Sequence, residues 1–159
     1  MRQLIFLGLF VFSVSVSAGD RLPSMVEVAQ LEAGALCGEQ AMGLRWIESP
    51  QQYQKLTGAT SVDEHLFSGR QDQRLLLVSM GQQRSAGFYL ELLSPQAQLQ
   101  DDRLHLMLAW HKPKPGQMTA QMITRPCLLL ALPMSAYQGV QVYDQQQRLQ
   151  FELELERQP

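Results

Sequence analysis

Apolar and polar residues alternate with a period of two through the second half of the chain. The alternation is clearest in residues 87–93, 104–111 and 149–156, and it predicts β-strands with one packed face and one wet face. Val140 and Val142 begin a strand that we expect to form a hairpin with the last of these segments. The residues of that segment expected to face inward are Leu149, Phe151, Leu153 and Leu155.

Two further segments are apolar on both faces. Residues 75–80 read LLLVSM, and residues 127–132 read CLLLAL. Strands of this kind are buried on both sides, so we expect two central strands with a layer packed on each face. Shorter strands are predicted at residues 25–31 and 43–48, and the Asp101–Asp102 pair is typical of a turn.

Helix signals occur only in the first half of the chain. Ser49 can cap a helix, Pro50 suits its first position, Gln52 completes a capping box, and Gly58 marks the end. The Ser61–Glu64 segment fits the start of a second short turn. Together the elements predict a mainly β domain, α+β at the margin: two packed antiparallel sheets or a small barrel-like sheet, with one or two short helices in the N-terminal half.

Residues 1–18 have the pattern of a secretory signal peptide. Arg2 precedes an apolar run over residues 4–16, and Ala18 suits cleavage after it. The run is short for a membrane span, so a retained anchor is the less favoured alternative. We therefore expect residues 19–159 to form a single domain that is periplasmic or secreted. Its few cations are scattered rather than clustered, which disfavours nucleic acid and anionic membranes as partners.

The chain has two cysteines, Cys37 and Cys127. In an oxidising compartment an isolated pair normally forms a disulfide, which is our prediction. The alternative is a thiol nucleophile or a metal ligand, which would need a nearby histidine and no partner thiol.

Enzymatic motifs are missing from the sequence. It contains no G-x-S-x-G, H-E-x-x-H or Gly-rich phosphate-binding pattern. His105 and His111 would share one face of a strand but lie about 20 Å apart, too far to share a metal ion. Glu91 stands among apolar residues, as some active-site carboxyls do, although a water-facing place at a sheet edge explains it more simply. We expect no catalysis, no cofactor and no metal.

Three segments, taken in order, resemble a known family. They are LLLVSMGQQRSAGFYLELL, RLHLMLAWHKPKPGQMTAQMITRP and CLLLALP, and they resemble the C-terminal domain of the protease complex subunit PrcB family over residues 74–133. WIESPQQYQKL is similar to the short helix upstream in that family. The positions that match are Gly81, Arg84, Gly87, Phe88, Pro115, Gly116, Gln121, Thr124 and Pro126. The sequence departs from the family at SAGF, where a P-T-G-G-Y-like loop is common.

The resemblance implies a secreted or surface domain that is not catalytic and that associates with a protease and supports its assembly. The same loops also resemble, more loosely, those of chagasin-like cysteine protease inhibitors, although Cys127 replaces the aromatic residue of their R-P-[WF] loop. An inhibitor-like, loop-presenting β-sandwich is therefore one alternative. Another is a small-ligand-binding or structural domain of the envelope, with a pocket lined by Trp46, Leu106 and Trp110. The loops would then be ordinary turns.

We expect the loops to bind another exported protein, such as a protease. Arg84 would supply a charge-assisted anchor and Phe88 or Tyr89 an aromatic one, since these residue types are enriched at binding hot spots. The full set of expected contact residues is Arg84, Ser85, Gly87, Phe88, Tyr89, Pro115, Gly116, Arg125 and Pro126.

Overall fold

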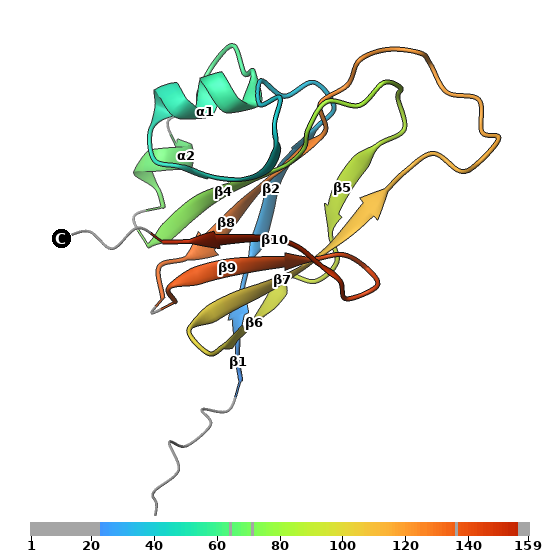
Figure 1. The fold of residues 1–159 in the computed structure, drawn as a ribbon. Helices are drawn as coiled ribbons and strands as arrows, with labels where there is room; N and C mark the ends of the chain where they lie inside the picture. Colours follow the sequence, from blue (N-terminus) through green and yellow to red (C-terminus); the bar gives the residue numbers. More distant parts are fainter. Residues whose placement is uncertain (1–22, 64, 71, 136, 156–159) are drawn as a thin grey trace, which may run out of the picture.

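The structure, a computed structural model, describes residues 23–63, 65–70, 72–135 and 137–155. The predicted signal peptide, residues 1–18, lies outside the described residues. Within these residues two β-sheets pack face to face, and two helices cover the outer face of the smaller sheet (Figure 1). The predicted mainly β fold with two sheets and short helices in the N-terminal half is confirmed.

The order of strands in each sheet differs from their order in the sequence. The larger sheet runs β1 (Ser24–Glu27), β6 (Gln96–Gln100), β7 (Arg103–His111), β9 (Gly139–Tyr143) and β10 (Leu149–Glu154), and β5 (Tyr89–Leu92) also pairs with β7. The smaller sheet runs β2 (Ala29–Gly34), β8 (Cys127–Pro133), β4 (Gln73–Met80) and β3 (Met42–Ile47). The helices are α1 (Pro50–Thr57) and α2 (His65–Ser68).

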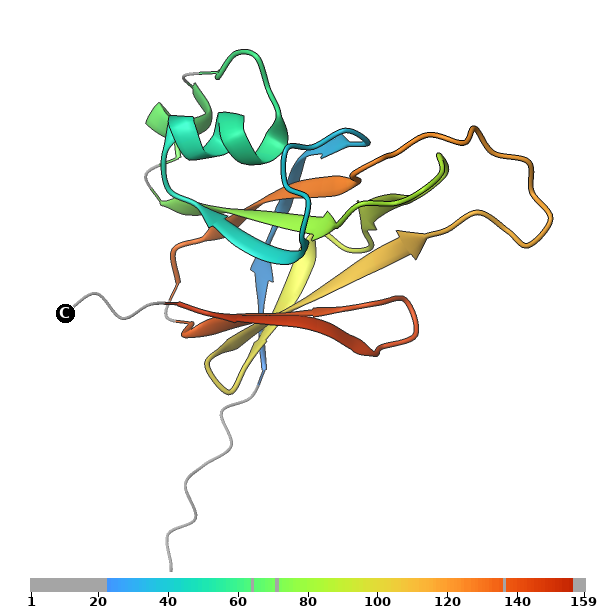
Figure 2. The same ribbon diagram turned by 45° about the horizontal axis from the view of Figure 1, so that its top comes forward.

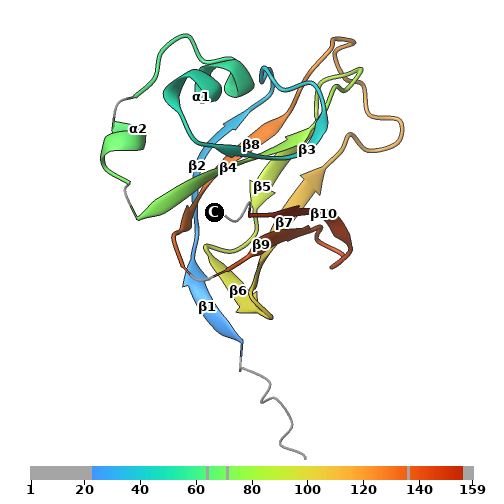
Figure 3. The ribbon, with the colours of Figure 1, turned by 60° about the vertical axis from the view of Figure 1, so that its left-hand side comes forward.

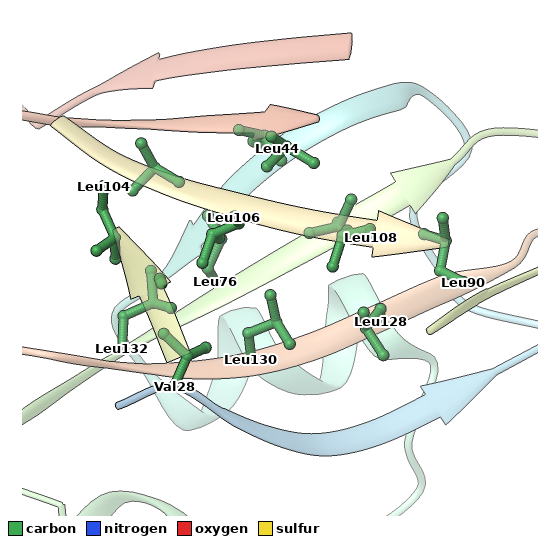
Figure 4. Packing of buried hydrophobic residues seen from close by; sticks show 14 of the residues in the cluster. Val28, Leu44, Leu76, Leu90, Leu104, Leu106, Leu108, Leu128, Leu130 and Leu132 are labelled. Atoms are coloured by element: carbon green, nitrogen blue, oxygen red, sulfur yellow. The ribbon is translucent and has the colours of Figure 1, made fainter. Parts of the chain in front are cut away.

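The two predicted central strands, β4 and β8, lie in the middle of the smaller sheet and are buried on both faces. One face meets the larger sheet, as Figure 4 shows for the leucines between them. The other face is covered by the helices, through Tyr53 of α1 and Leu66 of α2. Burial of the Tyr53 side chain and its bond to the Glu32 carboxylate raise the pKa of Tyr53 to about 12. The molecule is therefore three layers deep, and β4 and β8 form the middle layer.

Helix α1 has the predicted ends. The Ser49 Oγ accepts a hydrogen bond from the Gln52 N–H, and Gly58 ends the helix in the left-handed region at φ 78°. Helix α2 begins later than predicted, at His65, whose N–H donates to the Asp63 carboxylate. At both ends of α1 and at the start of α2, a capping residue thus satisfies a backbone group that the helix itself leaves free.

The predicted strand at residues 25–31 is two strands in different sheets. Chain direction changes at Val28, which is buried and donates its N–H to the Pro95 carbonyl, so β1 joins the larger sheet and β2 the smaller one. This crossing closes one side of the sandwich. A single segment of alternating residues gives no sign that its two halves pair with different partners.

The larger sheet also differs from the prediction at two places. Strand β6 was not predicted, and the Asp101–Asp102 turn, with φ values of 50° and 59°, joins it to β7. Strands β7 and β9 pair in parallel, whereas antiparallel sheets were expected. Between them the chain crosses to the smaller sheet to form β8 and then returns, so β9 runs in the direction of β7.

The β9–β10 hairpin was predicted, but its first inward position was not correct. Leu149 is 50% exposed, because the register shifts between Leu149 and Phe151. The turn is held by the buried Asp144 carboxylate, which accepts hydrogen bonds from the backbone N–H groups of Gln146 and Arg148 and from the Arg148 guanidinium. Burial alone would raise the pKa of Asp144, but these bonds, chiefly those from Arg148, outweigh it and hold the pKa below the ordinary value of an aspartate carboxyl.

Replacing Asp144 by asparagine is expected to destabilise the protein at neutral pH and to matter less in acid. Because the folded-state pKa is lowered, the stabilisation is fully present above the ordinary carboxyl pKa and is lost as the pH falls through the folded value. Denaturant unfolding of wild type and Asp144→Asn from neutral pH to about pH 2 measures this, with Glu27→Gln, at an exposed position, as control. If the difference in free energy of unfolding between wild type and Asp144→Asn stayed constant into acid, the lowered pKa of Asp144 would be contradicted.

Glutamine side chains satisfy backbone groups at exposed strand edges. The Gln145 carboxamide accepts from the Trp110 N–H at 3.0 Å and donates to the Trp110 carbonyl at 3.4 Å. Gln52 accepts from the Glu48 N–H and donates to the Trp46 carbonyl, both at 2.9 Å. A neighbouring strand would make the same pairs of bonds. The carboxamides therefore stand in for peptide groups at the edges of β7 and β3.

Candidate functional site

Three segments that are distant in the sequence meet at one end of the smaller sheet. Residues 35–42, 81–89 and 112–126, hereafter the loop surface, leave or enter the ends of neighbouring strands (Figures 1 and 2). The long 112–126 segment runs beside the 81–89 segment. The loops that the sequence singled out thus lie together, and residues 35–42 join them.

Hydrogen bonds hold the two longer segments against each other. Gln83 and Thr124 exchange backbone bonds at 2.8 and 3.0 Å, and Ala86 donates to the Ala120 carbonyl at 3.0 Å. The Thr124 hydroxyl, which is buried, donates to the Ser85 carbonyl at 3.0 Å. Bonds of this kind fix the backbone before any partner arrives, so less conformational entropy is lost on binding.

The third segment is fixed to the others by the disulfide. Cys37 and Cys127 are joined, as predicted, with their Cα atoms 6.1 Å apart. Beside them the Arg125 N–H donates to the Ala35 carbonyl at 2.8 Å, and the Cys37 N–H donates to the Arg125 carbonyl at 3.0 Å. Residues 35–37 therefore form one edge of the loop surface.

Two glycines allow close approaches within the loop surface. Gly81 has φ 68°, and a Cβ atom there would lie 3.0 Å from the Met42 backbone nitrogen. Gly87 has φ 92°, and its Cβ would lie 3.1 Å from the Pro113 side chain. Side chains are strained at such φ values, so both positions require glycine for backbone geometry.

The predicted contact residues differ in how far they reach solvent. Those exposed are Arg84, Gly87, Tyr89, Pro115 and Gly116. Ser85, Phe88 and Arg125 are half-buried, and Pro126 is buried. The Phe88 ring packs against the core between the sheets, so Tyr89 is the aromatic side chain that a partner could reach. The role of all these predicted contact residues in binding stays a prediction.

The sequence reasoning missed the exposed apolar residues of the loop surface. Met118 is 98% exposed, and several other large apolar side chains of these segments also reach solvent. These others are Leu36, Met42, Met122 and Ile123. The signal was present in the sequence as methionine and isoleucine within the otherwise polar QMTAQMIT. Exposed apolar groups that gather in one place mark sites of interaction more often than isolated ones do.

Tyr89 stands on a small polar and aromatic cluster at the base of the loop surface. Its ring stacks on His111, directly opposite in the β5–β7 pair, with centroids 3.9 Å apart and planes 7° apart. The Glu91 carboxylate lies 3.3 Å from the His111 Nε2. Glu91 is exposed on β5, in agreement with the sheet-edge interpretation. The stack limits the motion of Tyr89, which favours it as a rigid contact.

The pocket proposed as an alternative from the sequence is not formed. Leu106 is fully buried in the core, Trp46 lines a groove near β10, and Trp110 lines a separate hollow beside the β9–β10 turn. Among the described residues no group of three or more His, Cys, Asp or Glu side chains is placed to hold a metal ion. Neither described helix is long and apolar enough to cross a membrane.

Comparison with known proteins gives one match. Residues 75–133 match the family model described as PrcB C-terminal, which confirms the resemblance over almost the same residues. No curated protein and no solved structure matches the chain. The matched region begins in β4 and ends with β8, and it contains two of the three segments of the loop surface.

Proposed function

We propose, on the premise that residues 75–133 form a PrcB C-terminal-like region, that the protein is an exported, non-catalytic accessory domain that binds a protease through the loop surface. The family match suggests a protease-associated domain. The predicted signal peptide supports export, and the disulfide suits an oxidising compartment. The observation that carries the proposal is a set of exposed apolar side chains on loops that are already ordered by hydrogen bonds.

The loop surface has the properties of a protein-binding site. Met118 and Ile123 offer apolar area, and methionine adapts its shape to a partner more readily than branched residues do. Arg84 is exposed and makes no hydrogen bond or ion pair within the described part of the chain, so its guanidinium is available to a partner carboxylate. Tyr89 adds a rigid aromatic ring. Such a mixture of aromatic, methionine and arginine side chains is enriched at protein interfaces.

Replacing both Met118 and Ile123 by glutamate is expected to abolish capture of the protease. Each substitution places a charge in the apolar part of the interface, and loss of a hot spot weakens binding by about tenfold to a hundredfold or more. The measurement is crosslinking of the tagged mature domain in the native envelope, followed by identification of the bound protease and titration of the purified pair.

The control is Met25→Glu, which makes the same change at an exposed methionine of β1, outside the loop surface. Arg84→Ala with Tyr89→Ala tests the predicted anchors without touching the half-buried Phe88. Recovery of the same protease in equal amounts by wild type and by the Met118→Glu, Ile123→Glu pair, with both proteins folded, would exclude the loop surface as the binding site.

A further inference from the structure

A groove of about 780 Å³ runs along the edge of β3 on the side facing β10. Its walls are β3 from Leu44 onward and the end of β10 at Leu153, with the start of β4 at Leu75 and the exposed side chain of Met134 completing the lining. The groove extends from the start of β4 along β3 to Leu44, two residues from Met42 of the loop surface. Its lining shares no residue with the loop surface.

The groove exists because the sandwich is closed on one side and open on the other. On the closed side the chain crosses between the sheets at Val28, and Gln30 of β2 accepts a hydrogen bond from the Leu92 N–H of β5. On the open side β3 and β10 end their sheets and lie next to each other, and the two strands do not pair with each other (Figure 3). Two adjacent strand edges thus border one apolar hollow.

The outer edge of β3 offers two backbone N–H groups to a further strand, whereas the two carbonyls beside them already accept from side chains. The Leu44 and Trp46 carbonyls point to this edge, since they accept from the side chains of Arg45 and Gln52. In a strand the N–H of each residue points to the same side as its carbonyl, so the Leu44 and Trp46 N–H groups face the groove. At one end of this edge the Gln52 carboxamide already bonds to the Glu48 N–H and the Trp46 carbonyl, as a neighbouring strand would.

The charge of the groove favours an acidic occupant. Arg70 and Arg74 line it and make no ion pair with any described residue. Of the two carboxylates in the lining, Glu154 is already paired with Arg103. The Arg70 Nε and the Trp46 Nε1 are buried donors without an acceptor in the described structure.

We propose that this groove binds an extended acidic segment of a partner polypeptide as an additional strand on β3. Apolar side chains of the segment would lie between the sheets against Leu44 and Leu153, and its carboxylates would meet Arg70 and Arg74. Addition of a strand to an exposed sheet edge is a general mode of peptide recognition, in which backbone bonds supply affinity and side chains supply specificity.

A six-residue peptide of alternating valine and glutamate, acetylated and amidated, has the length of β3 and tests the proposal. Titration into the mature domain is expected to shift the backbone amide signals of Leu44 and Trp46 in NMR spectra, and added salt is expected to weaken the binding. The same peptide with lysine in place of glutamate is expected to bind at least tenfold more weakly. Equal affinity for the two peptides, or shifts confined to residues 112–126, would overturn the proposal.

Two variants locate the site. Met134→Glu and the Arg70→Gln, Arg74→Gln pair are each expected to weaken binding of the acidic peptide about tenfold, whereas Met118→Glu is expected to leave it unchanged. Circular dichroism checks that each variant is folded. Shifts of Leu44 and Trp46 that depend on protein concentration without peptide would assign the groove to a second copy of the chain and overturn the proposal. Protease capture by the loop surface is tested separately with the Met118→Glu, Ile123→Glu pair, so either site can fail alone.

Discussion

Replacing both Cys37 and Cys127 by alanine is expected to lower the free energy of unfolding by about 4–5 kcal/mol. The disulfide joins residues 90 positions apart, and in the chain-entropy model a loop of that length restricts the unfolded state strongly. Both cysteines are also buried in the core beneath the helices, so removal of the sulfur atoms leaves a small defect in packing. A loss of this size is a large fraction of the stability of most domains.

Guanidinium unfolding of the wild type with and without reductant, and of the double alanine variant with and without reductant, measures the effect. Reduction should destabilise only the wild type and bring it close to the variant. A difference below about 1 kcal/mol between oxidised and reduced wild type would show that the unfolded chain gains little from release of the loop. In the reduced protein residues 35–37 lose their covalent link, while the pairing of Gln83 with Thr124 remains.

Leu130→Ala is expected to cost about 2–5 kcal/mol, the second largest effect. Leu130 has no exposed surface and lies in β8, the strand covered by the larger sheet on one face and by the helices on the other (Figure 4). Neighbouring strands on both sides prevent the backbone from collapsing into the cavity. The matched control is Leu149→Ala on β10, where the leucine is half exposed and the expected loss is about 0.5 kcal/mol or less.

Thermal and denaturant unfolding of the two leucine variants measures the two losses of stability. A loss at Leu130 that is no larger than the loss at Leu149 would mean that the core between the sheets repacks, and the two-sided burial of β8 would then not govern stability. The comparison holds the chemical change constant and varies only the burial of the side chain.

Local patterns in the sequence predicted the elements that depend on local physics. The runs at residues 75–80 and 127–132 are apolar on both faces, and both became central strands. Ser49 and Gly58 determine the ends of α1 through hydrogen bonds and backbone geometry within a few residues. These features need no knowledge of the strand order.

Features that depend on distant partners could not be predicted. The change of sheet at Val28 follows from pairing with β6 and β8, which lie far along the chain. Gly38 shows the same limit: a Cβ atom there would overlap the Lys55 carbonyl oxygen of α1, so the need for glycine arises from another segment.

The candidate site was predicted in its backbone and missed in its side chains. Glycine and proline reveal turns, so Gly81, Gly87 and Pro115 were found. Whether an apolar side chain in a loop packs inward or reaches solvent depends on the fold around it, and Met118 and Ile123 proved to be exposed. Phe88 shows the converse, because it directly precedes β5 and its ring packs against the core between the sheets.

The glutamines at the strand edges bear on how the domain resists fibril formation. A free edge of backbone N–H and carbonyl groups can template strands of other chains, and proteins usually block it with lysine, proline or a bulge. Here Gln30, Gln52 and Gln145 each cover part of such an edge with a carboxamide, which carries the same donor and acceptor as a peptide bond. At these positions a weakly charged surface limits edge-to-edge pairing without added charge, and along β3 the protected part leaves only the stretch at Leu44 and Trp46 open to a strand.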